Sequence, residues 1–266
     1  GPMIYNVLTI AGSDSGGGAG IQADLKAISA RGCYGLSVIT ALTAQNTVSV
    51  DAIYPIAIDF IRAQCETVAR DIRIDAIKVG MLGTVEVTDL VSAFLATQSC
   101  PIVVDPVMVA KSGDRLLHRD AVEALRQRLL PLATVITPNL PEAADLLGVA
   151  EATDDQSMLM QARALQALGA RAVLLKGGHL LGDQLTDLLL TDRVDWFRGP
   201  RIQTHNTHGT GCSLSAALAA ELTKSQDLLH AVQVARGYLT EAIRHADALS
   251  VGSGHGPVHH FWEQTR

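Results

Sequence analysis

Short aliphatic runs alternate with helical patterns along almost the whole chain, and this alternation limits the fold more than any other feature of the sequence. The runs that read as strands or extended pieces cover residues 6–11, 36–42, 50–58, 76–79, 102–104, 135–137 and 172–175. Helical patterns lie between them, and two long helices are predicted over 210–224 and 227–249. Buried strands of continuous aliphatic residues, separated by helices, are typical of parallel sheets. The pattern therefore predicts an α/β fold whose mainly parallel sheet is covered on both faces.

An antiparallel hairpin is predicted at one edge of this sheet. Residues 185–190 and 194–197 read as strands, and only Thr-Asp-Arg separates them. No repeat, low-complexity tract or linker interrupts the pattern, so we expect a single domain over residues 3–266. Gly1 and Pro2, which precede Met3, are interpreted as the remnant of a cleaved expression tag.

Composition and charge disfavour several classes of protein. The cysteines are scattered and form no CxxC motif, which argues against a disulfide framework or a zinc site and favours a reducing cytoplasm. They are Cys33, Cys65, Cys100 and Cys212. The 21 basic residues are outnumbered by 27 acidic ones, and a net charge of -6 without a basic run disfavours nucleic-acid binding. No apolar run reaches the roughly 18 residues of a membrane span, so no membrane partner is expected.

Polar segments follow the predicted strands at the points where the strands end. They are AGSDSGGGAG (11–20), TAQN (43–46), KVGM (78–81), DPVM (105–108), TPNLPE (137–142) and KGGH (176–179). In a parallel sheet these segments meet at the carboxyl edge, where open α/β sheets bind their ligands. The sequence therefore predicts a ligand site along this edge.

The segment THGTGC (207–212) predicts an anion site, because it leads directly into a long helical pattern. The backbone N–H groups of Gly209 to Cys212 would be unpaired at the helix start, and glycine lets a phosphate approach closely. Lys176 supplies a second positive feature at another strand end. An ordinary glycine-containing helix entry is the alternative, and no GxxxxGK[ST] motif of a P-loop is present.

Two carboxylates lie in the same set of strand ends. Asp105 ends an aliphatic run, and Glu142 follows Pro141 at a predicted helix start. Near a phosphate site this pair suits magnesium, which proteins usually hold through one or two carboxylates together with substrate oxygens. The alternative for Glu142 is an acid that stabilises the helix dipole.

Asp24 and Gln45 are weaker candidates for the site. Asp24 lies at the border of the apolar stripe formed by Ile21 and Ile28, so it is either useful there or held in a buried cap or ion pair. The side chain of Gln45 could pair with the edge of an aminopyrimidine, or it could simply be solvated. No role follows from the sequence for His208, His259 or His260.

Taken together, these segments resemble one enzyme family along nearly the whole chain. The matching stretches are AGSDSGGGAGIQADLKA (11–27), VITALTAQNT (38–47), KVGMLG (78–83), DPVM, KSGD, TPNLPEA (137–143), LLKGGH, THGTGC and GHGPVHHF (254–261). They resemble the hydroxymethylpyrimidine/phosphomethylpyrimidine kinases of thiamin biosynthesis, in the ribokinase-like superfamily. The resemblance implies a three-layer α/β/α kinase and a homodimer. It further implies transfer of the γ-phosphoryl group of MgATP to 4-amino-5-hydroxymethyl-2-methylpyrimidine, and then to its monophosphate.

The resemblance also implies roles for individual residues. The pyrimidine pocket would be lined by Asp24, Gln45, Met81 and Val107. The phosphates would be held by Lys176 together with Gly209, Thr210 and Gly211. Asp105 and Glu142 would organise magnesium, and Asn139 would lie near the triphosphate. A monovalent cation is a further ion that the resemblance allows.

Cys212 stands where related kinases of the superfamily carry an aspartate that serves as the base. Phosphoryl transfer depends more on positioning and charge neutralisation than on a strong base, so a thiol could serve. A helix N-terminus should lower the pKa of the thiol below about 8.5, whereas an adjacent triphosphate would raise it again. The alternative is a small buried thiol that packs under the turn.

Three other functions are alternatives to this one. A pyridoxal or pyridoxine kinase on the same scaffold is the nearest alternative. A catalytically silent nucleotide- or vitamin-binding regulator is disfavoured by Lys176, Asp105, Glu142 and the GTGC turn. A dinucleotide oxidoreductase is disfavoured because SGGGAG lacks the GxGxxG spacing.

Overall fold

The protein is built around one eight-stranded sheet with the strand order β10-β9-β8-β7-β6-β5-β1-β2. The computed structural model describes residues 3–109, 113–178, 184–200 and 209–264. The strands of this sheet are β1 Asn6–Ala11, β2 Tyr34–Ile39, β5 Ala76–Val79, β6 Ile102–Val104, β7 Val135–Ile136, β8 Ala172–Lys176, β9 Gln184–Leu190 and β10 Val194–Pro200. Six strands run parallel, whereas β9 is antiparallel to both β8 and β10. The predictions of a mainly parallel sheet and of an antiparallel edge hairpin are confirmed.

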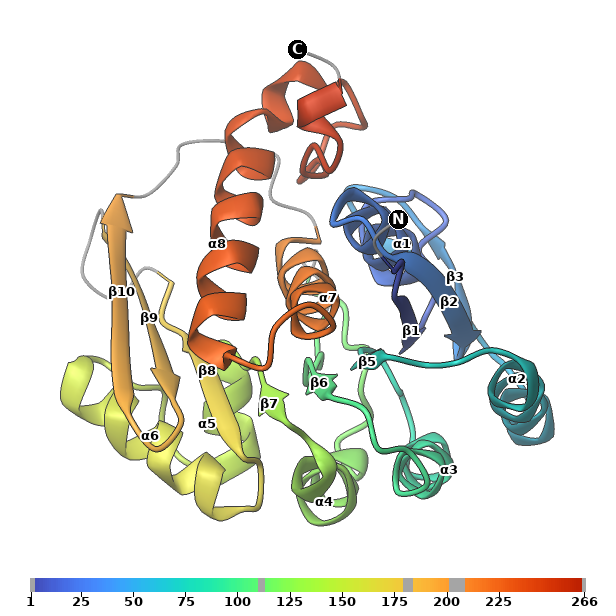
Figure 1. Ribbon diagram of the computed structural model, residues 1–266, viewed down its shortest axis with the longest axis horizontal. Coiled ribbons are helices and arrows are strands. Elements are labelled where there is room, and N and C mark those ends of the chain that lie inside the picture. Colours follow the sequence, from blue (N-terminus) through green and yellow to red (C-terminus); the bar gives the residue numbers. More distant parts are fainter. Residues whose placement is uncertain (1–2, 110–112, 179–183, 201–208, 265–266) are drawn as a thin grey trace.

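Helices cover both faces of the sheet and complete the predicted three layers (Figure 1). One face carries α1 Gly20–Ala30, α7 Thr210–Leu222 and α8 Leu228–Arg244. The other carries α2 Ile58–Asp71, α3 Val85–Leu95, α4 Ala121–Ala124, α5 Leu140–Leu147 and α6 Asp155–Ala167. Short helical turns at Leu125–Leu129, Leu130–Leu132, Ala246–Ala248 and Trp262–Gln264 complete the described structure.

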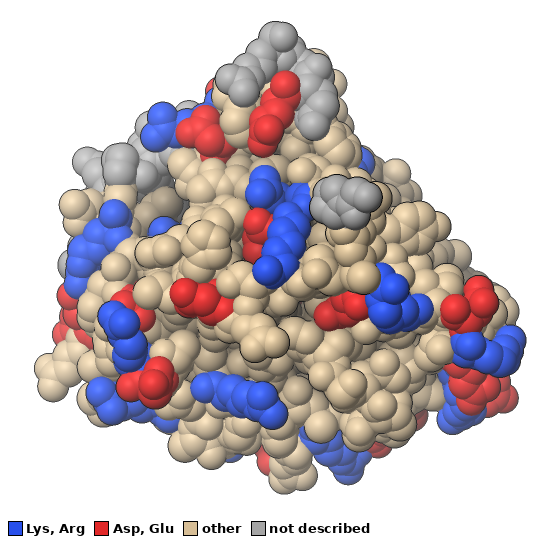
Figure 2. Space-filling model, viewed as in Figure 1, with Lys and Arg blue, Asp and Glu red and all other residues tan. Residues whose placement is uncertain are grey.

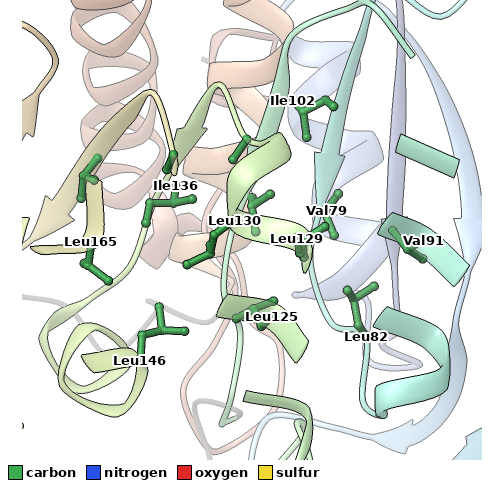
Figure 3. Packing of buried hydrophobic residues seen from close by; sticks show 14 of the residues in the cluster. Val79, Leu82, Val91, Ile102, Leu125, Leu129, Leu130, Ile136, Leu146 and Leu165 are labelled. Atoms are coloured by element: carbon green, nitrogen blue, oxygen red, sulfur yellow. The ribbon is translucent and has the colours of Figure 1, made fainter. Parts of the chain in front are cut away.

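Neighbouring residues of a strand pack into two separate hydrophobic cores. In β1, Leu8 packs into the core beneath α2–α6, whereas Val7 packs into the core beneath α1, α7 and α8. This follows from the alternation of side chains across a strand, and it explains why central strands need aliphatic residues at every position. Figure 3 shows the first core, in which Val79 and Ile136 of the sheet face leucines from the covering helices.

The predicted strand 36–42 is in fact two strands in two sheets. β2 ends at Ile39, and β3 Ala41–Gln45 pairs with β4 Val50–Pro55 in a separate two-stranded antiparallel sheet. Thr40 marks the break: its N–H donates to Ala11 O at 2.9 Å and its hydroxyl donates to Met81 O at 2.8 Å. These bonds turn the chain away from the main sheet, and the aliphatic pattern of the sequence did not reveal the turn.

Basic and acidic side chains are interspersed over the face shown in Figure 2. Within the residues that the structure describes, no helix is both long and apolar enough to cross a membrane. The single domain predicted from the sequence stays a prediction.

One ion pair is fully buried between the sheet and α1. Lys78 of β5 donates to both carboxylate oxygens of Asp24 at 2.9 Å, and Thr9 of β1 donates to Asp24 Oδ2 at 2.5 Å. Neither charged side chain is exposed to solvent. Burial is the largest influence on Lys78 and lowers its pKa, but Asp24, Cys212 and Asp105 together outweigh burial, so that the pKa is raised and the ammonium stays charged. Removing one partner alone would therefore leave a buried charge without compensation.

We predict that Lys78→Met lowers the free energy of unfolding by about 3–5 kcal/mol, as expected for a buried ion pair that loses one partner. The double variant Lys78→Met/Asp24→Asn should recover most of this loss, because no buried charge remains and the amide oxygen can still accept from Thr9. Urea unfolding would measure both variants.

The matched control is Arg62→Met, which breaks the exposed pair between Arg62 and Asp59 on α2. An exposed pair contributes about 0–1 kcal/mol, so this variant should unfold close to wild type. If Lys78→Met were as stable as Arg62→Met, the importance of the buried pair would be refuted.

Candidate active site

The start of α7 packs directly against the loop that follows β1. Gly209 has a φ of 77°, and a β-carbon at this position would lie 1.9 Å from Gly18 O, so only glycine fits. The N–H of Ser213 donates to Gly209 O at 2.8 Å, which closes the first turn of the helix. The N–H groups of Thr210, Gly211 and Cys212 therefore lie outside the internal hydrogen bonds of α7. This is the geometry of an anion site at a helix start.

The glycine-rich loop after β1 uses its own N–H groups internally. The carboxylate of Asp14 accepts from Gly16 N at 2.8 Å, Gly18 N at 3.1 Å and Ala19 N at 2.8 Å. Lys26 of α1 donates to Gly17 O at 2.8 Å and holds the loop from the other side. The loop is therefore a preformed wall beside α7 rather than a second phosphate cradle. The aspartate inside the glycine run was the sequence signal for this arrangement.

Charges of opposite sign converge on Gly211. A β-carbon at Gly211 would lie 3.3 Å from Lys176 Nζ and 3.6 Å from Asp105 Oδ2. Lys176 ends β8 and Asp105 follows β6, and these two strands flank β7, so their carboxyl ends are close. Ser215 of α7 contacts Asp105 Oδ2 at 3.5 Å. A side chain at position 211 would crowd both charged groups, and glycine leaves space next to the N–H groups of the turn.

Glu142 lies at a helix start and beside other charges, so both alternatives offered by the sequence are compatible with its position. Asn139 caps α5: its side chain accepts from Glu142 N at 2.9 Å, and Glu142 Oε1 accepts from Asn139 N at 2.9 Å. The carboxylate also lies near other charges. Burial, followed by the Asp105 carboxylate, raises the pKa of Glu142 to about 8, although Lys176 and the cap oppose this shift. Two neighbouring carboxylates, one of which resists ionisation, form an environment that favours an added cation.

The donor set fits magnesium only with help from a ligand. Among the described residues, no three or more histidine, cysteine, aspartate or glutamate side chains are arranged to hold a metal ion. Asp105 and Glu142 are two hard oxygen donors, and magnesium commonly takes its remaining ligands from phosphates and water. The residues present therefore fit a metal that arrives together with a nucleotide.

The thiol of Cys212 has a higher pKa than the helix start alone would give. Burial raises the pKa of Cys212 to about 11, although Lys78 and a hydrogen bond from the Gly20 backbone lower it. The sequence left open whether this pKa is lowered by the helix start or raised by its surroundings, and in the structure burial raises it. Cys212 is a half-buried residue of the first turn of α7, next to Gly20 of α1, where partial loss of water disfavours the thiolate more than the helix dipole favours it.

The predicted pyrimidine-binding residues occupy different depths. The sulfur of Met81 would lie 2.8 Å from a β-carbon at Gly12, so Met81 contacts the end of β1. Gln45 ends β3, and its backbone exchanges hydrogen bonds with the hydroxyl of Ser15 at 2.7 and 2.8 Å. Val107 is half-buried two residues after Asp105. These three residues lie on segments at the same edge of the molecule as the turn of α7.

Asp24 is placed differently from the others. It is fully buried in the pair with Lys78, so the ion-pair alternative describes the structure, and direct contact with a substrate stays a prediction. Lys78 itself was missed as a candidate. Its signal was a lysine within the otherwise aliphatic strand AIKV, where a charge is tolerated only with a partner.

Comparisons with known proteins identify the family of this chain. The family described as phosphomethylpyrimidine kinase matches residues 14–259. The hydroxymethylpyrimidine/phosphomethylpyrimidine kinase of Escherichia coli (strain K12) is 54% identical over 258 residues, which cover 96% of this chain and 97% of that protein. The protein of the same name from Rhizobium meliloti (strain 1021) is 53% identical over 260 residues, covering 97% and 98%.

Solved structures of related kinases share the fold of this chain. The ADP complex of Bacillus subtilis pyridoxal kinase matches with a TM-score of 0.90 and 37% identity, covering 99% of this chain and 100% of that one. The phosphomethylpyrimidine kinase of Clostridium difficile 630 matches with a TM-score of 0.80 and 41% identity, covering 90% and 99%. The fold is therefore ribokinase-like, and the chain belongs to the phosphomethylpyrimidine kinase family.

Proposed function

We propose that the chain transfers the γ-phosphoryl group of MgATP to the hydroxymethyl oxygen of 4-amino-5-hydroxymethyl-2-methylpyrimidine, and then to the resulting monophosphate, in thiamin biosynthesis. The observation that carries this proposal is the convergence of Lys176 and Asp105 on Gly211 at the start of α7. The relatives named above, with about half of their residues identical to this chain, support the choice of substrate. The proposed location of the reaction is the cytoplasm.

The chain stabilises the transferring group mainly through fixed positive charge. The N–H groups of Thr210 and Gly211 and the ammonium of Lys176 would hold the phosphate oxygens, with Asn139 close to the triphosphate. Because phosphoryl transfer spreads negative charge over the equatorial oxygens, such preorganised donors stabilise the transition state more than the ground state. Gly209 contributes by letting the turn lie against the loop after β1.

Asp105 and Glu142 would hold magnesium beside the phosphates, and the metal would neutralise part of their charge. With a pKa of about 8, the Glu142 carboxyl would give up its proton when the metal binds. A monovalent cation remains a prediction of the resemblance. On the substrate side, Met81 and Val107 would pack against the pyrimidine ring and Gln45 would bind its polar edge, with Asp24 beneath them.

Incubation of the protein with the pyrimidine alcohol and MgATP should yield products that carry one and then two added phosphates, as read by mass spectrometry. Because the site would match the amino-pyrimidine edge, kcat/KM for this alcohol should exceed that for pyridoxal by roughly tenfold or more. The reverse preference would indicate a pyridoxal kinase. Saturable binding without release of ADP would indicate a regulator.

Replacement of Cys212 by alanine should lower kcat about 10²- to 10⁴-fold, the usual contribution of a general base, with little change in ATP affinity. With a pKa of about 11, only about one thiol in 10⁴ is ionised at pH 7. The thiolate, which is the form that accepts a proton, becomes more abundant as pH rises. The kcat of the wild type should therefore increase with pH, by up to about tenfold per unit between pH 7 and pH 10.

This dependence on pH should be absent from Cys212→Ser, whose hydroxyl does not titrate in that range and which serves as the control. Near-normal turnover of Cys212→Ala would show that another group accepts the proton.

We further propose that the protein forms a homodimer through the outer face of the two-stranded sheet. Leu42 pairs with Tyr54 across this sheet, and Ala44 pairs with Ala52, so these four side chains share one face. All four are exposed, Leu42 by 43% and Tyr54 by 71%. The hydroxyl of Thr43, on the opposite face, donates to Ser13 O in the loop after β1. A second copy on the apolar face would thus cover one side of the sheet while the other side meets the site.

Tyr54→Glu should raise the dissociation constant of the dimer about tenfold or more, because it places a charge in the centre of the proposed interface. Light scattering across a range of protein concentrations would measure this change. Met160→Glu is the control. Met160 is 65% exposed, but it lies on α6, at the opposite end of the main sheet from the two-stranded sheet (Figure 1). A dimer that is equally sensitive to both variants, or a wild type that is monomeric, would refute the proposed interface.

A further inference from the structure

The C-terminal segment, residues 252–260, packs against elements that carry predicted site residues. Gly254 N donates to Thr47 Oγ1 at 3.0 Å, which joins the segment to the connection between β3 and β4, two residues after Gln45. A β-carbon at Gly254 would lie 2.0 Å from Thr47 O, so the two backbones are in close contact. At its other end, His260 reaches the first turn of α7. The segment therefore touches both the proposed pyrimidine side and the proposed phosphate side of the site.

His260 makes a buried side-chain hydrogen bond to α7. Its Nε2 lies 2.7 Å from Ser213 Oγ, and only 4% of the residue is exposed. Its backbone carbonyl accepts from the hydroxyl of Tyr238 on α8 at 2.7 Å, and His259 N donates to Ala242 O at 3.0 Å. The backbone that carries the ring is therefore fixed to α8.

Two contacts, called clamps here, hold the first turn of α7. One is the hydrogen bond between His260 and Ser213, and the other is the packing of Gly209 against Gly18. Gly209 begins the turn and lies against Gly18, whereas Ser213 closes the turn through its bond to Gly209 O. Gly209 has no side chain with which to cap the helix. Without a cap the first turn of a helix is weakly held, and the residues between the clamps are the ones whose N–H groups would bind phosphate.

The His260 ring is neutral at any pH at which the enzyme would be assayed. Burial lowers its pKa to about 3, and Lys26 and His259 add to this effect. The ring and the serine hydroxyl thus form a hydrogen bond between neutral groups, which fixes a position and adds no charge to the site.

We propose that His260 is a positioning residue for phosphoryl transfer. By holding Ser213, it fixes the first turn of α7, and with it Cys212 and the N–H groups of Thr210 and Gly211. This inference rests on the proposed function, because it assigns His260 to the same reaction. It gives a role to a buried histidine that lies next to a helix start without a capping side chain.

Ser213→Ala and His260→Phe should each lower kcat about 10- to 100-fold, because small displacements of reacting groups have large effects on rate. KM for the pyrimidine alcohol should change by less than about threefold, since the lost contact acts in the transition state. The double variant should be no slower than the slower single variant, because both remove the same hydrogen bond. Steady-state kinetics with the pyrimidine alcohol and MgATP would give all of these values.

Two further variants separate positioning from simple stability. His260→Gln should retain most of the wild-type kcat, because the glutamine amide can reach the position of Nε2. Trp262→Ala is the control in the same part of the chain. Trp262 stacks on His245 with ring centroids 5.0 Å apart, so its loss should lower the melting temperature without lowering kcat.

Normal kcat in Ser213→Ala and His260→Phe with a lower melting temperature would overturn the proposal, as would fully additive effects in the double variant. If His260→Phe does not fold, Ser213→Ala decides, because alanine favours the helix and should not harm folding. A wild type without phosphoryl transfer would instead refute the proposed function, and that result is read before any variant is made.

Discussion

Burial of a parallel sheet on both faces is the constraint on which the rest of this structure depends. Each of the strands β1, β2 and β5 to β8 runs in the same direction, because helices cross back over the sheet between them. The two cores on either side use alternate residues of the same strands. Most polar side chains of the sheet therefore lie at the strand ends, with Lys78 and Thr9 among the buried exceptions inside strands, and the carboxyl ends of the parallel strands all meet at one edge.

Charge at this edge is balanced by close neighbours rather than by solvent. Lys176 and Asp105 flank Gly211, and the neighbouring Glu142 is ionised with difficulty because it is buried beside Asp105. Deeper in the protein, Lys78 and Asp24 form a buried ion pair, although burial still raises the pKa of Asp24 against the effect of Lys78. The proposed site thus has an ion pair beneath it. Around Gly211, the positive charge of Lys176 does not balance the carboxylates of Asp105 and Glu142. An anionic substrate with a divalent cation would complete this set of charges.

The first turn of α7 is held in place without a capping side chain. On one side, Gly209 fits against the loop that Asp14 organises, and on the other side His260 holds Ser213. The same packing half-buries Cys212 and raises the pKa of its thiol. A tightly held turn and a weakly acidic thiol therefore have one cause, namely the burial of this turn among the loop after β1, α1 and the C-terminal segment.

The sequence by itself determined the layered α/β fold, the edge hairpin and the set of strand ends that are proposed to form the site. These features follow from local periodicity and from the position of polar residues after aliphatic runs, both of which can be read in a linear chain. Only the tertiary structure decided the break at Thr40, the pairing of Lys78 with Asp24, the pKa of Cys212 and the contact between His260 and Ser213. Each of these depends on groups distant in sequence that come together in space. Hydrogen bonds and loss of solvation act over a few ångströms in the folded protein, whatever the separation along the chain.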